Sequence, residues 1–148
     1  MKIRQMNTSP LLVATLMIAA TLLAVPSGAT DSETAFATLA AGCFWCIEAD
    51  LEKVEGIISV TSGYTGGSVA NPTYKQVSSG TTGHTEAVRV VFDPRVISYE
   101  ELLVVFWRNI APTVANRQFC DVGEQYRAGI FYHDEGQREA AEKSRDAL

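Results

Sequence analysis

A cysteine followed by two aromatic residues is the feature of this sequence most suited to chemistry. The motif Gly42-Cys43-Phe44-Trp45 lies where a short apolar run, residues 36–41, meets a pattern typical of a helix. At a helix N-terminus, unpaired N–H groups and the helix dipole favour a thiolate over a thiol. Cys43 is therefore a candidate nucleophile, and Phe44 and Trp45 offer an apolar wall beside its sulfur. A buried structural cysteine is the alternative interpretation.

A second candidate is a carboxyl group in the clearest predicted strand, residues 85–92. Strand alternation places Glu86 on the same face as Val88 and Val90. Burial of a carboxylate is costly unless the group is neutral or hydrogen-bonded, and burial raises its pKa. A carboxylic acid that stays protonated near neutral pH is suited to general acid catalysis. The alternative is an edge position from which Glu86 reaches water.

Two further cysteines, Cys46 and Cys120, complete the set of three in the sequence. Cys43 and Cys46 share one helix face, so their spacing allows a disulfide, a redox pair or half of a metal site. A zinc site needs about four nitrogen or sulfur ligands. The remaining candidates, His84 and His133, form no second pair with ligand spacing, so no metal site is predicted.

Four other polar residues are indecisive when taken singly. Tyr74, Tyr126 and Asp121 follow loop or irregular segments, where packing and turn formation are the more usual roles. His84 would suit a Cys–His nucleophile, although a structural or solvated histidine is more common.

The elements that must position these residues follow from hydrophobic periodicity. Ser98 and Glu101 have the spacing of a capping box. Four strands interleaved with short helices predict an α+β fold, a two-layer sandwich with a mixed sheet of about four strands and helices packed on it. The strands are predicted over residues 36–41, 57–64, 85–92 and 126–133, and the helices over residues 45–53, 74–79, 99–109 and 137–147.

The N-terminal segment has the pattern of a signal peptide. Lys2 and Arg4 precede an apolar run over residues 11–25, and small residues follow it. We expect a signal peptide over residues 1–29 and a single domain over residues 30–148 of an exported protein, periplasmic or secreted. An uncleaved membrane anchor is the alternative; after cleavage we expect no stable membrane contact.

The net charge and the number of cysteines limit the expected partners and disulfide pairings. The net charge is −5, all 17 acidic residues follow residue 29, and no basic stripe occurs, so nucleic acid is not an expected partner. In an exported chain, three cysteines cannot all pair internally. One of them should be free, or the pairing should change during a reaction cycle.

Five short motifs in register carry a family resemblance over residues 35–131. Together they resemble the A-type peptide methionine-sulfoxide reductases, which reduce the S-epimer of methionine sulfoxide. The motifs are Gly42-Cys43-Phe44-Trp45, Gly63-Tyr64-Thr65-Gly66-Gly67, Asn71-Pro72-Thr73-Tyr74, Gly83-His84-Thr85-Glu86-Ala87-Val88 and Gly123-Glu124-Gln125-Tyr126-Arg127.

The resemblance implies an α+β enzyme, expected to be a monomer, that repairs free or protein-bound methionine sulfoxide under oxidative stress. The roles of the family's site residues are assigned to the matching positions of this sequence. The resemblance implies Cys43 as the nucleophile, Glu86 as the acid that protonates the sulfoxide oxygen, Tyr74 and Tyr126 as hydrogen-bond donors to that oxygen, Asp121 as support for the polar network, and Phe44 and Trp45 as the pocket for the S-methyl group.

The chemistry of the residues agrees with this implication. A sulfoxide oxygen leaves poorly unless it is protonated, so the reaction needs a thiolate beside a neutral acid. Attack leaves a sulfenic acid on Cys43, which a second thiol can convert to a disulfide. A thioredoxin-like dithiol then restores the enzyme by exchange, and no metal or organic cofactor is required.

Three features depart from the family pattern, and the last of them leaves the resolving step open. Cys46 stands where glycine is commonest, and Ala111 where aspartate is usual. Many members extend past the position of Leu148 with a tail that carries resolving cysteines, so we expect a domain shortened at its C-terminal end. Cys46 is the first candidate for the resolving cysteine because it is local to Cys43. Cys120 is the second, and direct reduction by an external thiol is the third.

Other protein classes share parts of the pattern. A thioredoxin-like thiol–disulfide oxidoreductase would use Cys43-x-x-Cys46, but its fold needs a strand and a helix before the motif. A papain-type cysteine protease needs its histidine about 130–150 residues after the cysteine, further than this chain extends. A non-catalytic binding module is the remaining alternative.

Overall fold

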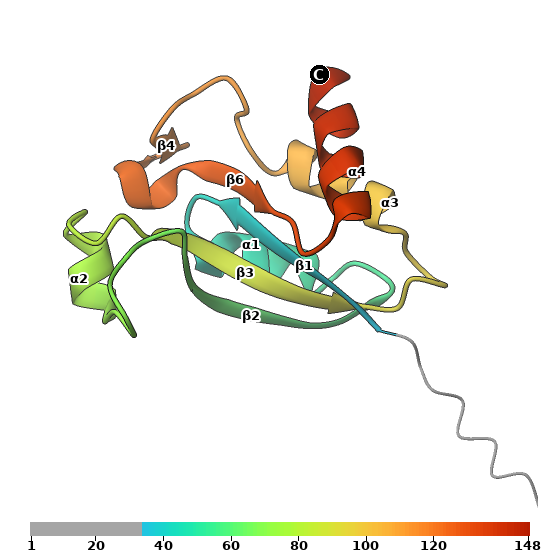
Figure 1. Ribbon diagram of the computed structural model, residues 1–148, viewed down its shortest axis with the longest axis horizontal. Coiled ribbons are helices and arrows are strands. Elements are labelled where there is room, and N and C mark those ends of the chain that lie inside the picture. Colours follow the sequence, from blue (N-terminus) through green and yellow to red (C-terminus); the bar gives the residue numbers. More distant parts are fainter. Residues whose placement is uncertain (1–33) are drawn as a thin grey trace, which may run out of the picture. The chain divides into compact units, whose positions relative to one another are not determined.

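A four-stranded antiparallel sheet forms the centre of the structure, a computed structural model that describes residues 34–148 (Figure 1). The predicted signal peptide lies outside the described residues. The strand order is β2-β3-β1-β6, so β3 and β1 are interior strands. The strands are β1 (Ala35–Ala41), β2 (Ile57–Thr65), β3 (Thr85–Phe92) and β6 (Ala128–Phe131).

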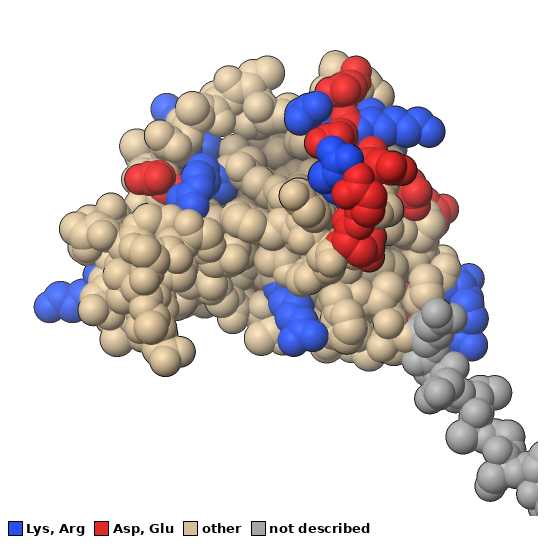
Figure 2. Space-filling model, viewed as in Figure 1, with Lys and Arg blue, Asp and Glu red and all other residues tan. Residues whose placement is uncertain are grey.

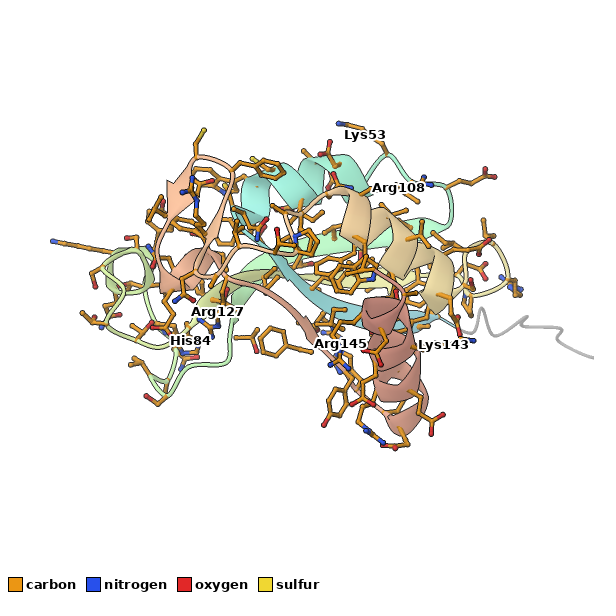
Figure 3. All side chains as sticks on the ribbon, turned by 90° about the horizontal axis from the view of Figure 1, so that it is seen from above. Lys53, His84, Arg108, Arg127, Lys143 and Arg145 are labelled. Atoms are coloured by element: carbon orange, nitrogen blue, oxygen red, sulfur yellow. The ribbon has the colours of Figure 1, made fainter. Side chains whose placement is uncertain are left out.

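Two of the helices cover the same side of the sheet. These are α1 and α3, while α4 packs against α3 (Figure 3). None of the helices within residues 34–148 is long and apolar enough to cross a membrane. The helices are α1 (Phe44–Leu51), α2 (Tyr74–Ser78), α3 (Tyr99–Arg108) and α4 (Glu135–Asp146), with a 3₁₀ turn η1 (Glu124–Tyr126).

The connections between strands bring four chain segments to one end of the sheet. The β1–α1–β2 and β3–α3–β6 units are split βαβ motifs, in which another strand lies between the two parallel ones. Because neighbours are antiparallel, the last residues of β1 and β2 lie beside the first residues of β3 and β6. Tyr64 pairs with Glu86, and Ala41 pairs with Ala128. Residues near these strand ends can therefore form one site.

The core lies between the sheet and helices α1 and α3. Trp107 packs against this core, and its indole N–H donates to Ser144 Oγ of α4 at 2.5 Å. The face seen in Figure 2 carries most of its charged side chains along α4, which leaves the rest of that face largely uncharged. The largest fully buried hydrophobic side chains are Leu39, Leu51, Val77, Val88, Val90, Phe92, Leu102, Leu103 and Phe106.

The predicted α+β class, the four strands of the sheet and its packed helices are confirmed. The three pairings within the four-stranded sheet are antiparallel, whereas the non-adjacent strands β1 and β2, and likewise β3 and β6, run in the same direction. The capping box is present, because Ser98 Oγ accepts from Glu101 N–H while the Glu101 carboxylate accepts from Ser98 N–H.

The clearest difference lies between α3 and β6. Residues 111–123, for which no helix or strand was predicted, contain a short hairpin of β4 (Arg117–Gln118) and β5 (Asp121–Val122). The expected strand over 126–133 is shorter, because the chain is still in the turn η1 at Tyr126. These short pairings depend on tertiary neighbours and leave little periodicity in the sequence.

Candidate active site

Cys43 occupies the N-cap of α1, directly after β1. Its carbonyl oxygen accepts from Cys46 N–H at 3.2 Å and from Ile47 N–H at 3.4 Å, and its side chain makes no capping bond. Gly42 has φ +88°, a conformation that L side chains rarely adopt, and a Cβ there would lie 2.5 Å from Gln118 Cβ. The turn that presents the Cys43 sulfur at the helix N-terminus therefore requires glycine.

Glu86 is buried on the interior strand β3, with 2% of its surface exposed. Its Oε2 accepts the backbone N–H of Phe44 at 3.0 Å, which places the carboxyl group at the first turn of the helix that begins after Cys43. Burial raises the pKa of Glu86, the bond from Phe44 opposes this, and the nearby charge of Asp121 raises the pKa further. The net direction is upward, so the environment favours the neutral acid. The edge position considered from sequence is wrong.

Four aromatic rings stand around this turn. The Phe44 ring centroid lies 5.7 Å from that of Trp45, 5.6 Å from that of Tyr64 and 6.4 Å from that of Tyr74. Trp45 and Tyr74 stack at 6.1 Å with an interplanar angle of 11°. Phe44 is buried, whereas 65% of Trp45 and 48% of Tyr74 is exposed. The rings therefore form one aromatic cluster that is buried at Phe44 and exposed at Trp45 and Tyr74.

Tyr126 lies near the other polar side chains of the site. Burial raises the pKa of Tyr126, and so, in decreasing order, do the charges of Glu86, Tyr74, Asp121 and Cys43. These side chains, which come from η1, β3, α2, β5 and the start of α1, are therefore electrostatic neighbours. With its pKa raised, Tyr126 remains a hydroxyl donor at neutral pH.

Tyr64 is a site residue that sequence reasoning missed. It pairs with Glu86 across strands β2 and β3, and its ring contacts Phe44. Burial raises its pKa, followed by the charges of Glu86 and Tyr74. The motif Gly63-Tyr64-Thr65-Gly66-Gly67 was a signal for it, but only the strand register shows that Tyr64 lies opposite Glu86.

The three cysteines line one cavity of about 420 Å³. All three are free; Cys43 is half-buried, whereas Cys46 and Cys120 are exposed. The thiol of Cys46 hydrogen-bonds to Cys43, and burial, this bond and the charge of Cys43 raise the pKa of Cys46. Cys46 is thus held as the protonated partner of the pair. Cys120 lies in the turn between β4 and β5, after Phe119, whose φ is +49°.

The histidines take part in loop structure instead of facing the sulfur. His84 Nδ1 accepts from Gly67 N–H at 3.3 Å, and its Nε2 bonds to Val69 O at 2.9 Å. His133 Nε2 bonds to Thr38 Oγ1 at 2.9 Å. No group of three or more His, Cys, Asp and Glu side chains suited to a metal ion is found within residues 34–148.

A second cavity lies away from these residues. It measures about 390 Å³ between α3, α4 and β6, and Trp107, Ile130 and Ala141 are among its lining residues. None of the candidate site residues lines it, whereas the three cysteines and Asp121 line the cavity beside Cys43.

Comparison with known proteins identifies the family of this chain. A family model described as "Peptide methionine sulfoxide reductase" matches residues 35–148. The chain belongs to the peptide methionine sulfoxide reductase family. It is 60% identical over 112 residues to the peptide methionine sulfoxide reductase MsrA of Ligilactobacillus salivarius, covering 76% of this chain and 65% of that protein. It is 56% identical over 112 residues to MsrA of Methanococcoides burtonii, covering 76% of this chain and 73% of that protein.

Solved structures of MsrA proteins share the fold. Methionine sulfoxide reductase A of Corynebacterium diphtheriae matches with a TM-score of 0.71 and 34% identity, over 76% of this chain and 53% of that chain. Reduced Mxr1 of Saccharomyces cerevisiae matches with a TM-score of 0.73 and 34% identity, over 77% of this chain and 67% of that chain. The present chain thus spans about two thirds or less of the length of several relatives that it matches. The family match does not favour the thioredoxin-like alternative.

The conformation of Gly42 gives a stability prediction for this MsrA-family chain. Gly42→Ala should lower the free energy of unfolding by about 1–3 kcal/mol, because alanine is strained at φ +88° and its Cβ would overlap Gln118. Urea unfolding followed by circular dichroism measures the change. The control is Gly129→Ala, whose nearest contact would be an ordinary 3.6 Å. Equal stability of the two variants would contradict the prediction.

Proposed function

We propose that this chain is a peptide-methionine (S)-S-oxide reductase that uses Cys43 as nucleophile and Glu86 as acid. One observation carries the proposal: the buried carboxyl group of Glu86 accepts the backbone N–H of Phe44 at 3.0 Å, one residue from Cys43. This arrangement places a group that favours the neutral acid beside a cysteine at a helix N-terminus. Reduction of a sulfoxide needs a neutral acid and a sulfur nucleophile in one place.

The proposed first step transfers oxygen from one sulfur to another. The Cys43 thiolate attacks the sulfoxide sulfur while Glu86 gives its proton to the sulfoxide oxygen. The new bond between the two sulfurs then breaks as the protonated oxygen moves from the substrate sulfur to Cys43, which leaves a sulfenic acid on Cys43 and releases methionine. The Cys43 sulfur thereby loses the two electrons that the substrate sulfur gains. Because Oε2 accepts from Phe44 N–H, Oε1 is the oxygen that would carry the proton.

Substrate recognition is divided between the aromatic cluster and two hydroxyl groups. We propose that Phe44 and Trp45 enclose the S-methyl group, and that Tyr74 and Tyr126 donate hydrogen bonds to the sulfoxide oxygen. Trp45 and Tyr74 are exposed and stacked, which supports binding of a methionine side chain presented by another protein. Asp121 supports the acid, since its charge raises the pKa of Glu86.

Regeneration is proposed to run through the local cysteine pair. The Cys46 sulfur attacks the sulfenic acid of Cys43, water leaves, and a Cys43–Cys46 disulfide forms. The hydrogen bond between the two thiols supports Cys46 as the resolving residue, while Cys120 in the same cavity is the second candidate. An external thioredoxin-like dithiol would reduce the disulfide, so thiol chemistry supplies both electrons and no metal or organic cofactor is needed.

The setting of this activity remains part of the proposal. The pattern over residues 1–29 supports export to the periplasm or outside the cell, where protein-bound methionine would be repaired. Yeast Mxr1 has been solved in complex with Trx2, and a reductant of that type on the same side of the membrane is proposed for this chain.

The activity itself is the first test. The purified chain with dithiothreitol should reduce the S-epimer of a methionine sulfoxide derivative and leave the R-epimer, and Cys43→Ser should abolish the reaction. Chromatography of the reduced product measures both. Cys120→Ser is the matched cysteine variant and should keep most of the activity with this reductant. Full activity of Cys43→Ser would exclude the proposed nucleophile, and reduction of insulin disulfides without sulfoxide reduction would favour the oxidoreductase.

The raised pKa of Glu86 gives a pH prediction with a definite sign. Its protonated form is the active one, so the rate should fall as pH rises through the raised pKa. Glu86→Gln should lower the rate by about 10²–10⁴-fold and remove this dependence. Burial also makes the neutral form the more favourable one in the folded chain. The contribution of Glu86 to the free energy of unfolding is therefore complete below its ordinary pKa of 4.5 and is lost as the pH rises through its raised pKa.

Two measurements check this prediction. Single-turnover rates across pH should show the alkaline decline in the unmodified protein only. Urea unfolding at pH 8 should find Glu86→Gln at least as stable as the unmodified chain, because glutamine keeps the acceptor for Phe44 N–H without a charge. An unchanged rate in Glu86→Gln at every pH would exclude the acid role.

The resolving step is expected to depend on Cys46 and not on Cys120. After one equivalent of sulfoxide, Cys120→Ser should form the Cys43–Cys46 disulfide as the unmodified chain does. Cys46→Ser should instead retain a sulfenic acid on Cys43 that dimedone labels, with loss of turnover by a thioredoxin-like dithiol. Peptide mass spectrometry identifies the products. A Cys43–Cys120 disulfide in the unmodified chain would assign the step to Cys120.

A further inference from the structure

Three consecutive residues at the start of β3 each bond to a different segment of the site. His84 bonds to the loop that leads into α2, through Gly67 N–H and Val69 O. Glu86 bonds to the start of α1. Thr85, between them, is fully buried, and its hydroxyl lies 3.0 Å from Gln125 O of η1 and 3.2 Å from Arg127 O. The start of β3 therefore anchors every segment that carries a proposed catalytic side chain except β5.

Among these segments, α2 has the weakest attachment to the core. It has five residues and only one buried side chain, Val77, yet it carries Tyr74. A helix this short is not stable on its own in water and depends on tertiary contacts. The loop before it is tied to the start of β3 by Ser68 N–H, which donates to Thr82 O at 3.3 Å, and by His84. The position of Tyr74 thus depends on a small number of bonds.

One side chain joins α2 directly to η1. Gln125 Nε2 donates to Ser78 O, the last residue of α2, at 3.3 Å, and only 8% of Gln125 is exposed. The Gln125 side chain lies against Gly123, where a Cβ would lie 2.5 Å from Oε1 and φ is +145°. Gln125 is followed by Tyr126, so the same residue borders one tyrosine and bonds to the helix that carries the other.

The surroundings of Gln125 keep it in place from two sides. Its carbonyl oxygen accepts from buried Thr85, while Arg127 donates to Glu124 O at 2.9 Å and to Gly83 O at 3.0 Å. Figure 3 shows Arg127 and His84 next to each other at this end of the sheet. The turn η1 is therefore attached to the rigid strand β3, and the amide of Gln125 extends this attachment to α2.

We infer that Gln125 is a positioning residue that sets the separation of the Tyr74 and Tyr126 hydroxyls, so that both reach one sulfoxide oxygen. The inference rests on the proposed function and adds to it a residue that touches no substrate. Loss of the amide bond to Ser78 O releases α2, and Tyr74 moves relative to Tyr126. A misplacement of about 1 Å in such a site can reduce a rate by up to about 10²-fold.

The test compares two glutamines that make the same kind of bond. Gln125→Glu keeps the shape but replaces the donor to Ser78 O with a carboxylate oxygen. The control is Gln137→Glu, which loses a bond from Nε2 to Phe36 O at 2.6 Å between α4 and β1, away from the site. Gln125→Glu should lower kcat about tenfold or more with KM within about twofold, whereas Gln137→Glu should leave both nearly unchanged.

A double-mutant cycle separates positioning from general destabilisation. If Gln125 acts through the tyrosine hydroxyl, Gln125→Glu should cost less than about twofold in kcat once Tyr74→Phe has removed that hydroxyl. A merely structural role would give the same cost in both backgrounds and would overturn the inference. Alkylation of Cys43 by iodoacetamide should proceed at the same rate in all folded variants.

The remaining outcomes are also decisive. Gln125→Met, of similar length and uncharged, replaces Gln125→Glu if the carboxylate prevents folding. If both fail to fold where Gln137→Glu folds, Gln125 is structural and the inference is overturned. An unmodified chain without sulfoxide reductase activity would overturn the proposed function, and the inference with it. An active chain in which Gln125→Glu matches Gln137→Glu would overturn the inference alone.

Discussion

The hydrogen bond from Phe44 N–H to Glu86 Oε2 is the interaction on which the rest of the site depends. It joins the first turn of α1 to an interior strand, and the residue before that turn is Cys43. The bond alone would favour a carboxylate, but burial acts in the opposite direction and is the larger effect. Glu86 therefore combines a fixed position with a preference for the neutral form.

Sheet topology explains why such a bond can form at all. In two split βαβ units with antiparallel neighbours, the ends of β1 and β2 meet the starts of β3 and β6. The segments attached at that end carry Cys43, Glu86, Tyr74 and Tyr126, although Cys43 and Tyr126 are far apart in the chain. The interior strand β3 holds Glu86, while the short elements α2 and η1 hold the two tyrosines. The latter need bonds such as that from Gln125 to Ser78 O, because they bury little apolar surface.

Cys43 and Cys46 lie on the same helix turn but differ in their surroundings. Cys43 lies at the N-cap, while Cys46 lies inside the first turn and hydrogen-bonds to it. Burial and the charge of Cys43 raise the pKa of Cys46, so the second thiol stays protonated beside the first. Cys120 reaches the same cavity from the turn of the β4–β5 hairpin, where Phe119 has a positive φ.

Local patterns in the sequence determined the elements and the chemistry of the site. The alternation of residues 85–92 predicted β3 and placed Glu86 on its apolar face, and the spacing of Ser98 and Glu101 predicted the start of α3. The position of Cys43 between an apolar run and a helical pattern likewise predicted a helix N-terminus. These features depend on neighbours within one or two turns, which is the range over which periodicity and capping act.

Only the tertiary structure decided which distant residues meet. The pairing of Tyr64 with Glu86 depends on strand register, because a shift of one residue would turn Tyr64 to the other face. The contact of Gln125 with Ser78 joins two short elements that carry almost no periodicity. The antiparallel direction of every strand pair likewise follows from how the crossovers pack against the core. Such contacts depend on packing across the whole domain, so no local window of sequence contains them.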